Sequence, residues 1–160
     1  MKYLSLLVFV LLSACNRTSP SERSKDRTVQ VHLHYGKYSD VNTFDSTLVK
    51  DLIPGTVKIP FSFTNQEQEM ILAKAESLDF FSYPDTLRRK PNVFVYPDLG
   101  PETIRLKNGN REVTVVSFWS VDDYYLKYFD GFQQLEKIIN DIVMAKPEYK
   151  ALPPQKGVYL

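Results

Sequence analysis

The segment TIRLKNGNREVTVVSF, residues 103–118, does most to decide the fold of this chain. Its Asn108-Gly109 pair lies between two runs of β-forming residues, where it is the strongest short-range signal for a hairpin turn. In the second run, apolar side chains such as Val115 and Val116 point to opposite faces, because successive residues of a strand alternate. Apolar residues on both faces are typical of a central strand. We therefore expect an antiparallel hairpin inside a larger sheet.

Further strands are expected on both sides of a first helix. Residues 29–35, VQVHLHY, alternate apolar and polar side chains, which predicts a strand with one buried face. Residues 57–63 alternate in the same way, and Pro60 favours an edge position because proline cannot donate to a ladder. Weaker β patterns cover residues 43–50 and residues 92–96.

Two helices are expected. Thr64 and Glu67 have the spacing of a capping box, which predicts a helix over residues 65–77. A second helix should begin between residues 122 and 127 and end near Ala145, before Pro147. Its apolar residues follow the spacing of one helical stripe: Leu135, Ile138, Ile139, Ile142 and Val143.

The order of these elements predicts the fold class. Strands, a helix, further strands and a second helix are typical of an α+β domain. We expect a mainly antiparallel sheet of four to six strands with two helices packed on one face. This single domain should cover residues 29–160.

The amino terminus has the pattern of a secretory signal peptide over residues 1–14. Lys2 is followed by an apolar run from Tyr3 to Leu12 and by the small residues Ser13 and Ala14. The run is shorter than the about 20 apolar residues that a bilayer-spanning helix needs.

Leu12-Ser13-Ala14-Cys15 resembles the lipobox of bacterial lipoproteins. The resemblance implies that Cys15 becomes the first mature residue, carries diacylglycerol on its thiol and is often acylated on its amino group. It places the protein in the cell envelope, anchored to a membrane. Asn16 follows where an aspartate would favour the inner membrane, so the outer membrane is favoured if the source is Gram-negative. Residues 15–28 should form the lipidated cysteine and a flexible tether, because residues 16–28 contain no aliphatic or aromatic side chain.

Composition excludes several classes of function. Loss of Lys2 with the signal peptide leaves 19 basic residues against 19 acidic ones, whereas nucleic-acid binding favours a basic domain. Cys15 is the only cysteine, so lipidation would leave no thiol for a disulfide, a metal or catalysis. Phosphate loops and the common hydrolase motifs are absent from the sequence, and we expect no cofactor.

Aromatic residues suggest a binding surface. Trp119, Tyr124, Tyr125 and Tyr128 lie close together in the sequence, and tyrosine and tryptophan are enriched at interfaces. Packing of these rings in the core is the alternative.

A second candidate is the basic run Arg88-Arg89-Lys90, which could contact an anionic lipid headgroup or a phosphate. The alternative is an ordinary solvated loop, because the run is short.

Two pairs of polar residues could carry chemistry. His32 and His34 would share one strand face and could approach one metal ion, but no carboxylate at a fixed spacing identifies itself as a further ligand. The sequence therefore favours solvent-exposed histidines and no metal site. Asp122 and Asp123 are most simply explained as the cap and the first turn of a helix.

The body of the chain also resembles small uncharacterised lipoproteins of Bacteroidota. The residues that carry this resemblance are Asn42-Thr43-Phe44, Lys50-Asp51-Leu52, Phe61 to Thr64, Glu67 and Phe80-Phe81. It covers residues 40–81 and, more weakly, the last helix and the Pro147-Glu148-Tyr149-Lys150 tail after it, and it implies no activity.

We therefore expect a non-catalytic, lipid-anchored envelope protein whose domain binds another protein. A binder of glycans or small ligands at Trp119 is the alternative. A hydrolase that uses Asp122, Asp123 and a histidine is less favoured.

Overall fold

The computed structural model describes residues 28–35, 39–52, 55–95 and 100–153. Within these residues, seven strands form one sheet in the order β4-β3-β2-β1-β6-β7-β5. All neighbouring strands are antiparallel except β5 and β7. The strands are β1 Val29–Tyr35, β2 Ser39–Asn42, β3 Thr47–Leu52, β4 Gly55–Pro60, β5 Thr86–Leu87, β6 Glu102–Asn108 and β7 Arg111–Ser117.

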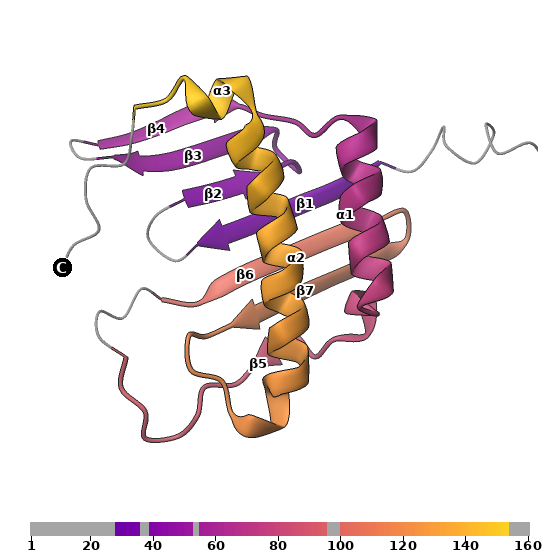
Figure 1. The fold of residues 1–160 in the computed structure, drawn as a ribbon, viewed down its shortest axis with the longest axis vertical. Coiled ribbons are helices and arrows are strands. Elements are labelled where there is room, and N and C mark those ends of the chain that lie inside the picture. Colours follow the sequence, from indigo (N-terminus) through magenta and orange to yellow (C-terminus); the bar gives the residue numbers. More distant parts are fainter. Residues whose placement is uncertain (1–27, 36–38, 53–54, 96–99, 154–160) are drawn as a thin grey trace, which may run out of the picture.

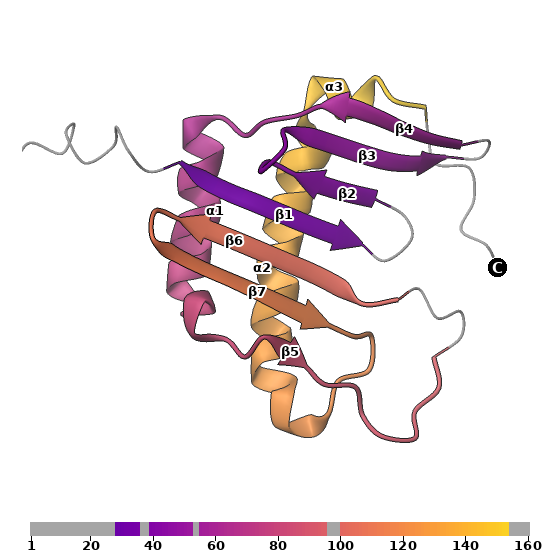
Figure 2. The same ribbon diagram turned by 180° about the vertical axis from the view of Figure 1, so that it is seen from behind.

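Both long helices pack on the same face of this sheet, as Figures 1 and 2 show from opposite sides. They are α1 Asn65–Ser77 and α2 Leu126–Ala145, and a short helix α3 Pro147–Lys150 follows α2. The α+β class and the placement of two helices on one face are thus confirmed. The sheet has seven strands where four to six were expected.

The alternation of β1 explains why one face is covered and the other is open. Val31 and Leu33 are fully buried against the helices, whereas His32 and His34 point to the opposite face. In Figure 2 the strands lie in front of both helices, and no described helix covers that side of the sheet. The side chains of His32 and His34 are partly exposed on this face.

The core lies between the sheet and the two helices. The fully buried side chains include Val31, Leu33, Leu48, Ile71, Phe80, Leu87, Ile104, Leu106, Phe132, Leu135 and Ile139. They come from β1, β3, β5, β6, both helices and the short 3-10 helix Phe80–Ser82, so the core depends on contacts between segments that are distant in the sequence.

The predicted helix boundaries are confirmed. Thr64 and Glu67 form the expected capping box, with each side chain accepting a hydrogen bond from the other residue's backbone N–H. The Glu67 carboxylate also accepts a hydrogen bond from Lys146 Nζ at 2.6 Å, which joins the start of α1 to the end of α2. Although burial opposes ionisation, these bonds together lower the pKa of Glu67.

Several strand predictions need correction. The residues 43–46 form a turn, β3 extends to Leu52, and the strand at Ser39–Asn42 was not predicted. The strand expected over 57–63 runs over 55–60, and its position at the edge of the sheet agrees with Pro60. The described part of the strand expected over 92–96 is not a strand. Instead, the short strand β5 lies earlier and pairs with β7.

The hairpin of residues 103–118 is confirmed as β6 and β7. Gly109 in its turn has a φ of +60°, a conformation that glycine adopts without strain. β7 lies between β6 and β5, as expected for a strand with apolar residues on both faces. The predicted signal peptide, Cys15 and the tether up to residue 27 lie outside the described residues.

Candidate functional site

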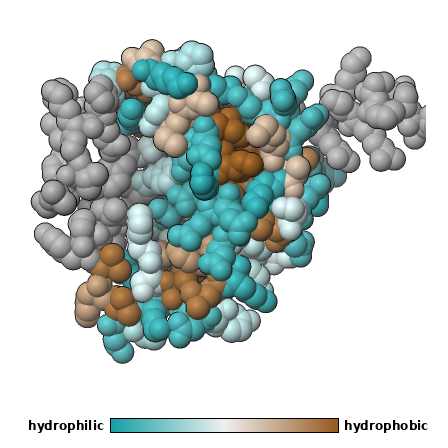
Figure 3. Space-filling model, viewed as in Figure 1, coloured by the Kyte–Doolittle hydropathy of each residue, from teal (hydrophilic) through white to brown (hydrophobic). Residues whose placement is uncertain are grey.

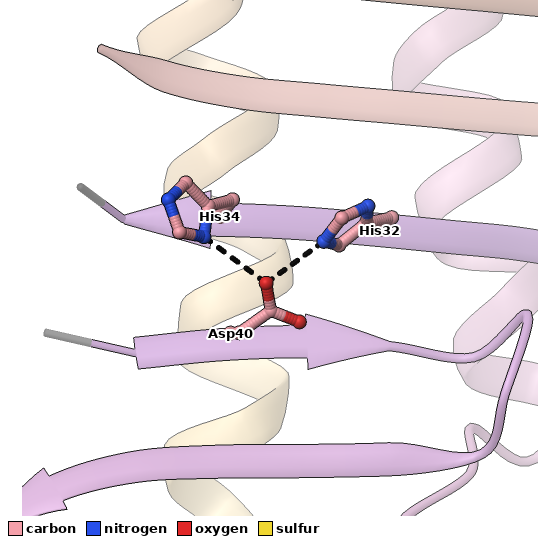
Figure 4. Close-up of side chains that lie close together, drawn as sticks. All are labelled: His32, His34 and Asp40. Atoms are coloured by element: carbon pink, nitrogen blue, oxygen red, sulfur yellow. Dashed lines mark hydrogen bonds and ion pairs between the residues drawn. The ribbon is translucent and has the colours of Figure 1, made fainter. Parts of the chain in front are cut away.

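The open face of the sheet carries a compact group of three polar side chains (Figure 4). Asp40 Oδ2 lies 2.8 Å from His32 Nε2 and 3.0 Å from His34 Nδ1. One ligand atom from each residue lies within 4.8 Å of the others. The three side chains therefore converge on one point above the β1–β2 pair.

The register of the first two strands produces this convergence. His34 lies directly opposite Asp40, and His32 lies two residues along the same face. The intervening residue Leu33 is fully buried, and β6 pairs with the other side of β1. The histidine backbones are thus held between two strands, while the side chains of His32, His34 and Asp40 remain 28%, 42% and 27% exposed.

Sequence reasoning found the two histidines and missed the carboxylate. Asp40 lies in β2, the strand that was not predicted, so nothing placed it opposite His34. The register explains why the spacing matters: Tyr35 pairs with Ser39, so residue 40 lies beside residue 34.

The four aromatic residues of the predicted binding surface have two different environments. Trp119 and Tyr124 are exposed, with 52% and 74% of their surface accessible. Tyr125 and Tyr128 instead pack against the hydrophobic core, and the Tyr128 ring lies 5.0 Å from that of Tyr83. Only half of the predicted aromatic surface is therefore available to a partner.

The basic run lies directly beside the aromatic segment. Arg89 forms an isolated β-bridge with Val121, and the backbone N–H of Lys90 donates to the carbonyl of Ser120. The Arg89 guanidinium stacks over the Phe118 ring at 5.2 Å. The predicted basic and aromatic surfaces are thus parts of one region.

We call this region the β5 end and define it as residues 88–95 and 118–126. Its exposed apolar side chains include Phe94, Trp119, Tyr124 and Leu126, of which Phe94 is almost fully accessible. Figure 1 places both segments at the lower end of the molecule, and Figure 3 shows apolar side chains reaching the surface there. Clustered exposed apolar side chains are typical of an interaction site.

The carboxylates proposed for catalysis have structural roles. Asp122 accepts a hydrogen bond from the backbone N–H of Tyr124 and caps a 3-10 turn before α2, as expected. Asp123 pairs with Lys90 Nζ at 3.0 Å. The backbone N–H of Asp122 donates a hydrogen bond to the carbonyl of Arg88, the residue that follows β5. β6 and β7 lie between β1 and β5 in the sheet, so three strand spacings, about 14 Å, separate the histidine strand from β5. The structure does not bring these carboxylates to the histidines.

A second polar group, which sequence reasoning missed, lies under α2. Tyr35 ends β1 and lies opposite Glu102 at the start of β6, and Glu136 of α2 lies near both. Burial raises the pKa of Glu136 to about 7, and the nearby Glu102 charge adds to this shift. Burial also raises the pKa of Glu102 and, with Glu136, that of Tyr35.

This second group combines the Tyr35 hydroxyl with the carboxyl groups of Glu102 and Glu136, all of which are largely buried. The Tyr35 hydroxyl lies near Glu136, but it has no hydrogen bond of normal geometry within the described residues, and neither does Ser117 Oγ. Such groups make stability depend on pH, because the buried carboxyls prefer to stay protonated.

No family model, curated protein or solved structure matches this chain. Among the described residues, no helix is long and apolar enough to cross a membrane.

Proposed function

We propose that this chain is a lipid-anchored protein of the bacterial cell envelope whose domain binds another envelope protein without catalysing a reaction. The anchor is Cys15, carrying diacylglycerol, and the outer membrane is favoured in a Gram-negative source. The lipobox-like sequence and the polar segment after it support the anchoring. Acyl chains buried in a bilayer would hold the protein firmly, at about 0.8 kcal/mol per CH₂ group.

The observation that carries the binding proposal is the exposure of large apolar side chains at the β5 end. Trp119 and Tyr124 are exposed on segments that the β-bridge and the Lys90–Asp123 ion pair hold together. Rigid aromatic side chains of this kind dominate the energy of many protein interfaces. We propose a partner protein with an apolar recess that receives these two rings, beside which the exposed Arg88 can pair with an acidic group.

The position of the β5 end suits a protein attached by its amino terminus. Val29 pairs with Asn108 at one end of the strands, whereas Ser117 pairs with Glu102 at the opposite end. β1 therefore begins at one end of the strands, and residues 118–126 follow β7 at the opposite end. A membrane-attached tether would leave the β5 end free to meet a partner.

Binding of glycans or small ligands is the second candidate function. The exposed rings of Trp119 and Tyr124 favour it, because flat aromatic side chains also stack on sugar rings. Trp119 is the only tryptophan of the chain, so its fluorescence would report ligand binding directly.

In-cell crosslinking of the tagged, lipidated protein tests both parts of the proposal. A Cys15→Ser variant should lose the membrane fraction, since the lipid cannot attach. Trp119→Ala with Tyr124→Ala should lose the main crosslinked partner, with affinity weakened at least about tenfold. Met144→Ala is the matched control, because this side chain is also exposed but lies near the end of α2.

Each outcome has a defined meaning. A partner that the double variant still captures would show that the β5 end is not the binding surface. Absence of any partner, combined with quenching of Trp119 fluorescence by sugar oligomers, would replace the protein-binding proposal with the glycan one. Equal membrane association of the Cys15→Ser variant would refute the lipid anchor.

A further inference from the structure

We propose that His32, His34 and Asp40 bind a divalent transition-metal ion, with Zn²⁺ as the best fit. This inference is independent of the lipid anchor and of the partner at the β5 end. It rests on the convergence of two imidazole nitrogens and one carboxylate oxygen on the open face of the sheet.

The donor set selects the class of ion. Ca²⁺ and Mg²⁺ prefer sites made entirely of oxygen atoms, so two imidazoles argue against them. Imidazole suits Zn²⁺, Cu²⁺, Fe²⁺ and Ni²⁺, and Zn²⁺ also accepts a carboxylate oxygen. Catalytic zinc sites commonly combine three protein ligands with one open position that water fills, so three ligands are enough to hold the ion.

The distances agree with such a site after small side-chain movements. Zinc lies about 2.0–2.2 Å from nitrogen and oxygen ligands, so neighbouring ligands of a tetrahedron lie about 3.3 Å apart. Asp40 Oδ2 now lies 2.8 Å and 3.0 Å from the two nitrogens, which are themselves within 4.8 Å of each other. Each ligand atom would move by less than about 1 Å, a change that rotation of the side chains supplies without movement of the strands.

The scaffold and the surroundings also permit binding. The ligands project from two paired strands, which hold a site more firmly than a loop does. Their partial exposure leaves room for the ion and its water. Arg105 lies opposite His32 on β6, but its charge is paired with Glu112 at 2.7 Å and lies over the Phe44 ring.

Titration of the chain with Zn²⁺ in a calorimeter, and with Co²⁺ in a spectrophotometer, tests the proposal. The full chain is used without a polyhistidine tag, and with Cys15→Ser in every sample so that a thiol cannot bind the ion. We expect one ion per chain, a raised melting temperature and the visible absorption of tetrahedral Co²⁺. Binding should weaken at low pH, because protons compete for the imidazoles.

Four variants locate the ion. Mutation of a group that only supports a metal ligand typically weakens metal affinity about 10–100-fold. Removal of a ligand itself should cost at least as much, so His32→Ala and His34→Ala should each weaken binding by this factor or more. Asp40→Asn preserves the size of the side chain but removes its charge, and should also weaken binding. Gln30→Ala is the matched control, because Gln30 lies on the same face of β1 two residues before His32.

The proposal fails if the parent chain binds neither Zn²⁺ nor Co²⁺ at ion concentrations up to about 1 mM. It also fails if His32→Ala and His34→Ala bind Zn²⁺ as tightly as Gln30→Ala, since the ion would then lie elsewhere. Melting temperatures measured without metal show whether the variants fold. They should remain close to that of the parent, because the histidines lie on the open face of the sheet.

Discussion

Gly131 in the second turn of α2 offers a sharp test of the packing between this helix and the segment after α1. In an exposed helix interior, replacement of glycine by alanine stabilises by about 1 kcal/mol. At this position, an added Cβ would lie 2.0 Å from Tyr83 Oη and 3.1 Å from Tyr83 Cζ. The Tyr83 ring cannot swing away freely, because it packs against Phe80 at 4.8 Å and Tyr128 at 5.0 Å.

The expected effect of Gly131→Ala is therefore a loss of stability. Overpacking of a filled site costs about 1–3 kcal/mol, which outweighs the gain in helix propensity. We expect the free energy of unfolding to fall by about 1 kcal/mol and the melting temperature by about 2–4 °C. Tyr83→Phe removes the hydroxyl that causes the closest contact. In that background, Gly131→Ala should be neutral or stabilising by up to about 1 kcal/mol.

Urea denaturation of the four proteins in this double-mutant cycle measures the coupling between the two positions. The expected coupling free energy is about 1–2 kcal/mol, within the range found for residues in contact. Stabilisation by Gly131→Ala in the parent background would refute the reasoning. An equal cost in both backgrounds would also refute it, because the Tyr83 hydroxyl would then not be the obstacle.

Two further predictions concern the polar groups of the fold. The pKa of Glu136 is raised from 4.5 to about 7 in the folded state, so its contribution to stability is present below about pH 4.5 and is lost as pH rises through 7. Glu136→Gln should therefore flatten the decline of the unfolding free energy over this range, with a difference of about 1–2 kcal/mol at pH 8 after allowance for solvent screening. Parallel declines in both proteins would contradict it. Thr64→Ala removes half of the capping box with Glu67 and should lower the unfolding free energy by about 1 kcal/mol in urea titrations, whereas Thr64→Ser should cost less.

Much of the local structure could be predicted because its causes are local. The alternation within β1, the turn at Gly109 and the capping box of Thr64 and Glu67 all depend on residues within a few positions of one another. The apolar stripe of α2 is likewise a local pattern, and it predicted a helix that ends at Ala145.

The strand predictions failed where the pattern was weak or the strand was short. β2 has four residues and only one buried side chain, Val41, so no alternation of apolar residues marks it. β5 has two residues and is a strand only because β7 lies beside it. The missed β2 also concealed Asp40, and with it the third member of the histidine group.

The sequence by itself determined the fold class, the two helices and the open face on which His32 and His34 lie. Only the tertiary structure decided which groups meet: Asp40 with the histidines, residues 88–90 with residues 120–122, and Glu136 with the end of β1. The physical reason is that periodicity reports which face of an element is buried, a property of its own residues. The order and register of strands instead follow from how all the apolar faces are buried together, and no short segment contains that information.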